Sequence, residues 1–186
     1  MSWIKQIREK AGASKLRKLL KGKKRTKSML TFDEARIVGV LFNADNPMSY
    51  DAVRKFIANL SAKHIRLKVY GYSSGKTTHN IFLSDPVIRT FNAKQVDFSF
   101  FPTTYVCDDF TISKFDILVN LDTTQQFPLY VLSALADATF KIGCYTKTQS
   151  CYDLMMDVNI SKPVDYILDQ IYRYLDMFKN SSSKAV

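Results

Sequence analysis

The chain has 186 residues, 46% of them hydrophobic and 13% aromatic, which suffices for one ordinary domain with a sizeable core and excludes a disordered protein. Its formal net charge of +10 is unevenly distributed. Residues 1–27 hold eleven Lys or Arg and a single acid, Glu9, whereas the other sixteen basic residues are balanced by sixteen acids. The basicity therefore belongs to the amino-terminal segment alone.

Cysteine and histidine usage argues against a metal site and a disulfide framework. The three cysteines form no C-x-x-C pair, and neither His64 nor His79 lies near one of them in the sequence. An odd number of cysteines cannot all pair within one chain, so we expect a reducing compartment, no zinc and no other cofactor. No histidine or base accompanies Cys107, Cys144 or Cys151, which disfavours a cysteine nucleophile.

Residues 1–30 are predicted to form a basic amphipathic helical segment. Trp3, Ile4, Ile7 and Ala11 recur at helical spacing, and three leucines (Leu16, Leu19 and Leu20) continue the pattern after Gly12. The segment contains no apolar run of signal-peptide length and none long enough to span a bilayer. Secretion and membrane insertion are both disfavoured.

Three partners remain open for this segment. Its apolar stripe can pack on the domain or on a partner subunit, including a second copy of the chain. It can lie on an anionic membrane surface, with Trp3 and the aliphatic side chains in the interface. It can neutralise nucleic-acid phosphates, although Trp3 is its only aromatic residue and single-strand binders usually carry several. The residues expected to contact an anionic surface are Lys18, Lys21, Lys23, Lys24 and Arg25.

From Arg36 onward the sequence alternates between strand and helix patterns. Strands are predicted at Ile37–Phe42, Ile65–Tyr72, Gln95–Phe101, Phe115–Leu121, Thr139–Gly143 and Tyr152–Val158. Helices are predicted from about Tyr50 to Lys63, from Pro128 to Asp137 and after Pro163. Such alternation predicts a single three-layer α/β domain of the Rossmann or flavodoxin type, with an open, mainly parallel sheet, over residues 31–180 and a disordered tail at 181–186.

The stretch Tyr70–Asn80 contains Gly-Lys-Thr but does not fit a P-loop. That motif needs four residues between its two glycines, whereas Gly71 and Gly75 are separated by three and Tyr70 stands where the first glycine should. The residues after Thr77 are also a poor start for a helix. We expect Ser73–Asn80 to be a polar surface loop. No G-x-G-x-x-G is present either, so no bound dinucleotide is expected.

Polar residues follow two of the predicted strands with the same spacing. Asn43-Ala-Asp45 and Asn120-Leu-Asp122 resemble the D-x-D motif of aspartate-nucleophile phosphatases, but asparagine replaces the nucleophile. In open α/β sheets, ligands bind beyond the carboxyl ends of strands. A candidate ligand site therefore comprises Asn43, Asp45, Asn46, Gly71, Asn120, Asp122, Thr123 and Thr124. The alternative is that these residues form turns and cap helices.

Two resemblances extend this interpretation. The block Phe115–Gly143 is similar to a segment in the amino-terminal half of heptosyltransferases, which implies the fold. The basic amino terminus, Ile37–Ala44, Tyr50–Leu60, Val96–Phe101 and the same block together resemble a family of small bacterial proteins with no established activity. That resemblance implies a bacterial cytoplasmic protein and supplies no catalytic residue.

These observations favour a non-catalytic binding or adaptor protein, cytoplasmic or peripheral at the inner membrane, whose basic segment contacts an anionic membrane or a protein partner. The alternative is an enzyme or sensor that binds a phosphorylated or sugar metabolite, with Asp45 and Asp122 as polar anchors.

Overall fold

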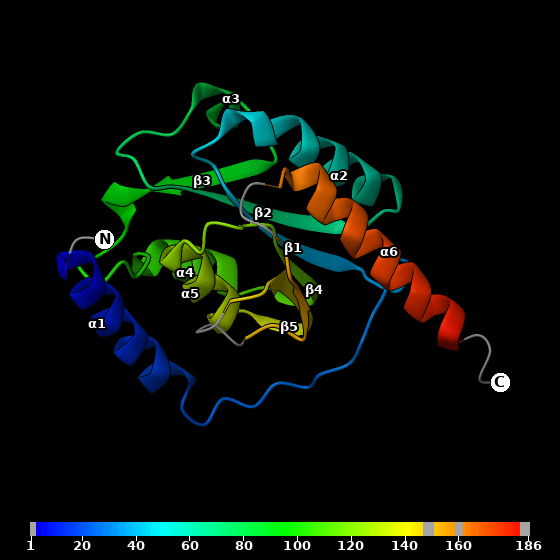
Figure 1. Cartoon of the computed structure of the whole chain (residues 1–186), viewed down its shortest axis with the longest axis horizontal. Coiled ribbons are helices and arrows are strands. Elements are labelled where there is room, and N and C mark those ends of the chain that lie inside the picture. The colour runs from blue at the N-terminus through cyan, green and yellow to red at the C-terminus, as the bar shows by residue number, and fades with distance from the viewer. Residues whose placement is uncertain (1–2, 147–150, 159–161, 183–186) are drawn as a thin grey trace.

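The computed structural model describes residues 3–146, 151–158 and 162–182, and its centre is a six-stranded sheet with the order β3-β2-β1-β4-β5-β6 (Figure 1). Every neighbouring pair of strands is parallel. The strands are β1 (Ile37–Asn43), β2 (Arg66–Ser73), β3 (Ile88–Asn92), β4 (Lys114–Asn120), β5 (Asp137–Cys144) and β6 (Leu154–Met156). The predicted α/β parallel-sheet fold is confirmed.

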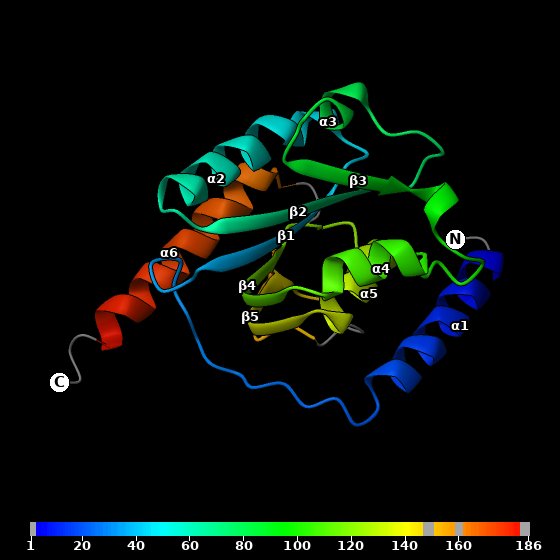
Figure 2. The ribbon, with the colours of Figure 1, turned by 180° about the vertical axis from the view of Figure 1, so that it is seen from behind.

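Helices cover both faces of the sheet (Figures 1 and 2). Helices α2 (Tyr50–Ala62) and α6 (Val164–Ser182) lie on one face, and α1 (Trp3–Leu20), α4 (Thr104–Thr111) and α5 (Phe127–Leu135) lie on the other. The short elements are η1 (Pro47–Ser49), α3 (Asn80–Leu83) and η2 (Ala93–Gln95). Helix α6 continues two residues into the segment predicted as a tail, and residues 183–186 lie outside the described residues.

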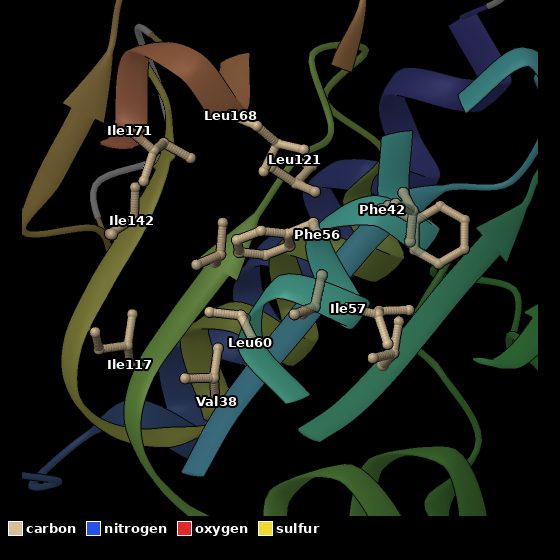
Figure 3. Close-up of a cluster of buried hydrophobic side chains, with 14 of the residues drawn as sticks. Val38, Phe42, Phe56, Ile57, Leu60, Ile117, Leu121, Ile142, Leu168 and Ile171 are labelled. Carbon is tan, nitrogen blue, oxygen red and sulfur yellow. The ribbon is translucent and has the colours of Figure 1, made fainter. Parts of the chain in front are cut away.

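The core between the sheet and α2 and α6 consists of aliphatic and aromatic side chains from distant parts of the chain (Figure 3). Val38 of β1 and Ile117 of β4 are fully buried beneath Phe56 and Leu60 of α2. Full burial of one such side chain contributes about 1.5–3 kcal/mol. The continuous apolar runs of β1 and β4 follow from burial on both faces of the sheet.

The opposite core is more aromatic. Phe110 of α4 packs against Phe115 with ring centroids 5.0 Å apart and against Tyr70 at 5.2 Å. Leu118 and Leu129 are fully buried beside them.

The prediction of a strand at Gln95–Phe101 is wrong, and β3 forms this edge of the sheet instead. The carboxylate of Asp97 accepts hydrogen bonds from the backbone N–H groups of Ser99 (2.7 Å) and Phe101 (3.0 Å). Phe100 has a positive φ of 57°. Such a side chain-to-backbone turn competes with strand pairing, and here it folds the aromatic run back on itself.

Residues 21–36 connect α1 to β1 along the outside of the molecule, and we call this segment the strap (Figure 1). Helix α1 ends before Gly22, whose φ of +81° suits the residue that follows a helix. Within the described residues, no helix has the length and apolar content needed to cross a bilayer.

Candidate functional site

The topology brings together the predicted polar residues at the carboxyl edge, which we define as the sheet edge where the strands end. Strands β1 and β4 are neighbours although two other strands of the sheet lie between them in the sequence. The direction of winding reverses between them, which is the position where open α/β sheets bind ligands. Asn43 ends β1 and Asn120 ends β4. The Asn43 amide donates a hydrogen bond of 2.8 Å to the Thr124 hydroxyl across this point.

The Asp45 carboxylate is occupied by neighbouring donors. One oxygen accepts hydrogen bonds from the Ser73 hydroxyl at 2.9 Å and the Ser74 backbone N–H at 2.8 Å. The other lies 3.4 Å from the Gln126 side-chain amide. Asp45 therefore ties the exits of β1 and β2 to the segment that precedes α5.

Asp122 is also engaged, and it is only 5% exposed. One oxygen accepts from the backbone N–H and hydroxyl of Thr124 (2.9 and 2.6 Å), and the other accepts from the Gln126 backbone N–H (2.6 Å). Burial raises the pKa of Asp122 above its ordinary value despite these hydrogen bonds. The carboxylate shapes the turn before α5.

Three other predicted residues have structural contacts. The Asn120 amide donates to the Tyr152 hydroxyl at 2.8 Å and to Ser133 at 3.2 Å. Asn46 caps η1 by accepting from the Met48 N–H. Gly71 lies inside β2, where a Cβ would come within 2.6 Å of the Phe42 ring. The glycine at this position permits close packing.

A cavity of about 260 Å³ nevertheless lies at the carboxyl edge, between the strand exits and the first turns of α2 and α6. Lys162, Pro163 and Asp165 line its α6 side. The predicted residues that line it are Asn43, Asn46, Thr123 and Thr124. Asp45 and Asp122 are not among the lining residues.

The Gly-Lys-Thr segment is a loop, as predicted. Strand β2 ends at Ser73, and the four-residue helix α3 begins only at Asn80. The Gly75 carbonyl accepts a hydrogen bond from Ala93 N–H. A P-loop instead leads directly into a helix whose amino terminus holds phosphate.

The inner face of α1 packs closely on the body of the domain. Gly12 and Leu16 are buried, and a Cβ at Gly12 would lie 2.3 Å from the Ser99 carbonyl oxygen and 2.5 Å from the Phe127 ring. Beside this contact, the Arg8 guanidinium lies 3.7 Å from the centroid of the Phe100 ring.

An ion pair fixes the same helix further along. Lys15 lies 2.8 Å from Asp97. Burial raises the pKa of Asp97, but the hydrogen bonds from Lys15 and the Ser99–Phe101 turn outweigh it and lower the pKa to about 2. The first part of the chain is therefore joined to residues far along it by packing and by charge.

The outer face of α1 carries a second apolar surface. Trp3 is 69% exposed, and Ile4 and Ile7 are each 48% exposed. At about 100° per residue, these side chains lie roughly 150° around the helix from Gly12 and Leu16. We call Trp3, Ile4 and Ile7 the outer face. The same spacing places Lys10 beside it and Arg17 and Lys18 further along the same side of the helix, and all three are exposed.

The predicted cationic residues divide into two groups. Lys18, Lys21, Lys23 and Lys24 are exposed, and the ion pairs seen within residues 3–27 involve none of them. Arg25 is engaged instead. Its guanidinium lies 2.6 Å from the Asp153 carboxylate and donates 2.7 Å to the Ala138 carbonyl.

The cysteines are held as thiols. Burial raises the pKa of Cys107 and of Cys151 to about 11 and that of Cys144 to about 12. In the part of the chain that the structure describes, no group of three or more His, Cys, Asp or Glu side chains is placed to hold a metal ion.

Residues 8–178 match the model of a family of unknown function, DUF6913. The chain belongs to this family. No curated protein matches the sequence. The comparisons show neither a similarity to heptosyltransferases nor a bacterial origin. The DUF6913 match covers α1 from Arg8 onward and the α/β domain as far as Phe178 of α6, so Trp3, Ile4 and Ile7 lie outside it.

The sequence did not indicate the roles of Gly12, Arg8 or Lys141. In the sequence, Gly12 interrupts a helical pattern. Such a glycine can be attributed to close packing only when the segment that packs against it is known. Lys141 interrupts an apolar strand and is 3% exposed, and this interruption is the one signal that could have drawn attention to it.

Proposed function

We propose that this DUF6913 protein is a non-catalytic peripheral binding protein that attaches to anionic membrane surfaces through the outer face of α1 and the lysines that follow it. The observation that carries the proposal is the division of α1 into two apolar surfaces. Gly12 and Leu16 hold the helix on the domain, so Trp3, Ile4 and Ile7 are presented outward on a fixed support. A tryptophan and aliphatic side chains followed by cations along the same side of the helix suit the interface between headgroups and acyl chains.

The charge distribution supports the same partner. Lys10 lies beside the outer face, Arg17 and Lys18 continue along the same side of α1, and Lys21, Lys23 and Lys24 extend the positive surface beyond the helix. Each cation close to an anionic bilayer contributes about 1 kcal/mol, and burial of an apolar side chain contributes about 1.5–3 kcal/mol. Neither contribution suffices alone for stable attachment, so we expect both to be required.

Co-sedimentation with vesicles tests the proposal. The full chain is compared on phosphatidylserine-containing and pure phosphatidylcholine vesicles, together with a variant that changes Lys18, Lys21, Lys23 and Lys24 to Gln. The matched control changes four exposed lysines elsewhere on the domain, Lys55, Lys76, Lys94 and Lys114, to Gln.

We expect binding only to anionic vesicles, about 100- to 1,000-fold weaker binding by the first variant, and little change in the control. Equal losses in the two variants would indicate a response to net charge alone and would refute the assignment. Retention on an anionic nucleic acid but not on anionic vesicles would replace the membrane with nucleic acid as the partner.

One observation favours a second candidate function, the binding of a small phosphorylated or sugar ligand at the carboxyl edge. The cavity of about 260 Å³ lies where the sheet changes winding direction, and Lys162 lines it beside Thr123 and Thr124. Isothermal titration with a panel of sugar phosphates tests this candidate. Binding that is lost in Thr124→Val and kept in the exposed control Thr104→Val supports it, and absence of binding across the panel removes it.

A further inference from the structure

A second cavity, of about 520 Å³, lies between the carboxyl end of α5, the start of β5 and the strap. Its lining includes Leu135, Asp137 and Cys151 from the body and Leu20 from α1. The charged residues that line it are Lys23, Lys24, Arg25 and Lys27 of the strap, Asp137 and Lys141. It is separate from the carboxyl edge and from the outer face of α1.

Lys141 is the unusual member of this lining. The residue is 3% exposed and forms no ion pair among the described residues. Its amine donates to the Ser133 carbonyl at 2.6 Å and the Ala134 carbonyl at 3.3 Å, at the end of α5. These contacts use two of the three N–H positions of an ammonium group, and the third carries the lone pair when the group is neutral.

The surroundings of the amine make its neutral form more accessible than that of an exposed lysine. Burial, together with the charge of Arg25, lowers the pKa of Lys141 to about 8, although Cys151, Asp153 and Asp137 act in the opposite direction. The remaining cations facing the cavity are Lys23, Lys24 and Lys27. An exposed lysine has a pKa of about 10.4, so near pH 8 the free-amine fraction of Lys141 is roughly 100-fold larger.

The strap supplies positive charge at the same cavity. Arg25 and Lys27 both pair with Asp153, at 2.6 and 3.3 Å, whereas Lys23 and Lys24 are exposed and form no ion pair within the described residues. The cavity thus combines a buried amine with cations that are free to meet an acidic group. A nucleophilic lysine is activated by desolvation or by a neighbouring cationic group, and both surround Lys141.

We propose that this cavity binds a small aldehyde or ketone carrying a phosphate or carboxylate group, and that the Lys141 amine forms a reversible imine with its carbonyl carbon. The nitrogen lone pair attacks the carbonyl carbon to form a C–N bond and a carbinolamine. The former carbonyl oxygen then leaves as water together with the two protons of the amine. Protonation of the imine from solvent restores one N–H, which continues to donate to the Ser133 carbonyl. Lys23 and Lys24 hold the acidic group.

Trapping with an anionic aldehyde tests the site without vesicles, so its outcome is independent of membrane binding. The full chain is treated with stoichiometric pyridoxal 5′-phosphate and cyanoborohydride between pH 6 and 10, and the labelled lysines are identified by peptide mass spectrometry. The parallel reagent is pyridoxal, which lacks the phosphate. The variant is Lys141→Arg, with the exposed Lys114→Arg as its matched control.

We expect Lys141 to be the first lysine labelled, with a labelling rate that has its pH midpoint near 8. The rate should be tenfold or more higher with pyridoxal 5′-phosphate than with pyridoxal. The Lys141→Arg variant should lose this fast phase and Lys114→Arg should keep it. Mapping on the wild-type chain decides the question even if Lys141→Arg fails to fold. Labelling that spreads over exposed lysines while Lys141 stays unmodified in the folded protein would overturn the proposal.

Discussion

Gly12 of α1 faces the carbonyl oxygen of Ser99 so closely that a Cβ on Gly12 would lie 2.3 Å from it. No real Cβ is found at such a distance from a backbone oxygen, and the Phe127 ring closes the other side at 2.5 Å. The contact determines how α1 sits on the domain and hence which of its faces points outward.

A Gly12→Ala substitution should therefore release α1 although alanine is the better helix former. Because Trp3 is the only tryptophan, the steady-state fluorescence anisotropy of the protein reports on α1 alone. We expect lower anisotropy in Gly12→Ala with the melting of the α/β domain preserved. The exposed Ser14→Ala also raises helix propensity and should leave the anisotropy unchanged. Unchanged anisotropy in Gly12→Ala would mean that the neighbouring backbone moves to accommodate the methyl group.

The attachment of α1 should weaken in acid because of Asp97. The pKa of this carboxyl is lowered to about 2, so its stabilising effect is fully present above the ordinary value of 3.8 and is lost as the pH falls towards 2. Trp3 anisotropy should accordingly decrease between about pH 4 and pH 2. Asp33, which binds Lys63 and Lys179, titrates in the same window but lies on the other side of the sheet. Asp97→Asn should remove the acid step seen in the anisotropy, and Asp33→Asn should not.

The buried amide of Asn120 should contribute measurably to stability. Asn120→Ala leaves Ser133 and the Tyr152 hydroxyl with fewer partners inside the domain and is expected to cost about 1–3 kcal/mol in the free energy of unfolding. Tyr152→Phe removes one hydroxyl while Asn120 keeps Ser133 as a partner, so its cost should be smaller. Urea denaturation followed by circular dichroism measures both. A larger loss in Tyr152→Phe would show that the tyrosine hydroxyl, rather than the Asn120 amide, is the principal member of this hydrogen-bond network.

Membrane attachment should change the emission of Trp3. The side chain is 69% exposed, and transfer into the bilayer interface is expected to shift its fluorescence to the blue. The shift should occur with phosphatidylserine vesicles, decrease as salt is raised and disappear in the quadruple lysine variant. Emission unaffected by vesicles that sediment with the protein would place the contact elsewhere.

The parallel sheet could be predicted from sequence because its inner strands are apolar on both faces. Near-continuous apolar runs such as Ile37–Phe42 and Phe115–Leu121 are typical of parallel strands that are buried on both faces. The edge strand β3 could not be predicted, since only Ile88 and Phe91 of Ile88–Asn92 are buried, while the more apolar Gln95–Phe101 forms a turn around Asp97. The hydrophobic pattern favoured Gln95–Phe101 as the strand. That segment forms a turn instead, because the Asp97 carboxylate accepts hydrogen bonds from its backbone N–H groups.

The candidate site was predictable in position but less so in role. Placing Asn43 and Asn120 at one edge needs only the parallel order of the strands. The sequence could not show whether Asp45 and Asp122 point towards a ligand or form hydrogen bonds within their own turns, because contacts with neighbouring residues determine the orientation of these side chains. For the amino-terminal segment, the sequence predicted a helix with one apolar stripe. The helix instead has an inner and an outer apolar surface, because Gly12 and Leu16 lie opposite Trp3 and Ile7.

The partners of α1 also bear on how the chain folds as it is synthesised. Lys15 pairs with a residue 82 positions later, and Arg8 with one 90 positions later. The helix therefore leaves the ribosome long before Asp97, Phe98 and Phe127 exist to receive it. During that interval both of its apolar surfaces are uncovered, and the nascent chain presents them to any bilayer or chaperone nearby. Once α5 is complete, the inner surface would pack on the domain, and only the outer surface would remain in contact with the bilayer or chaperone.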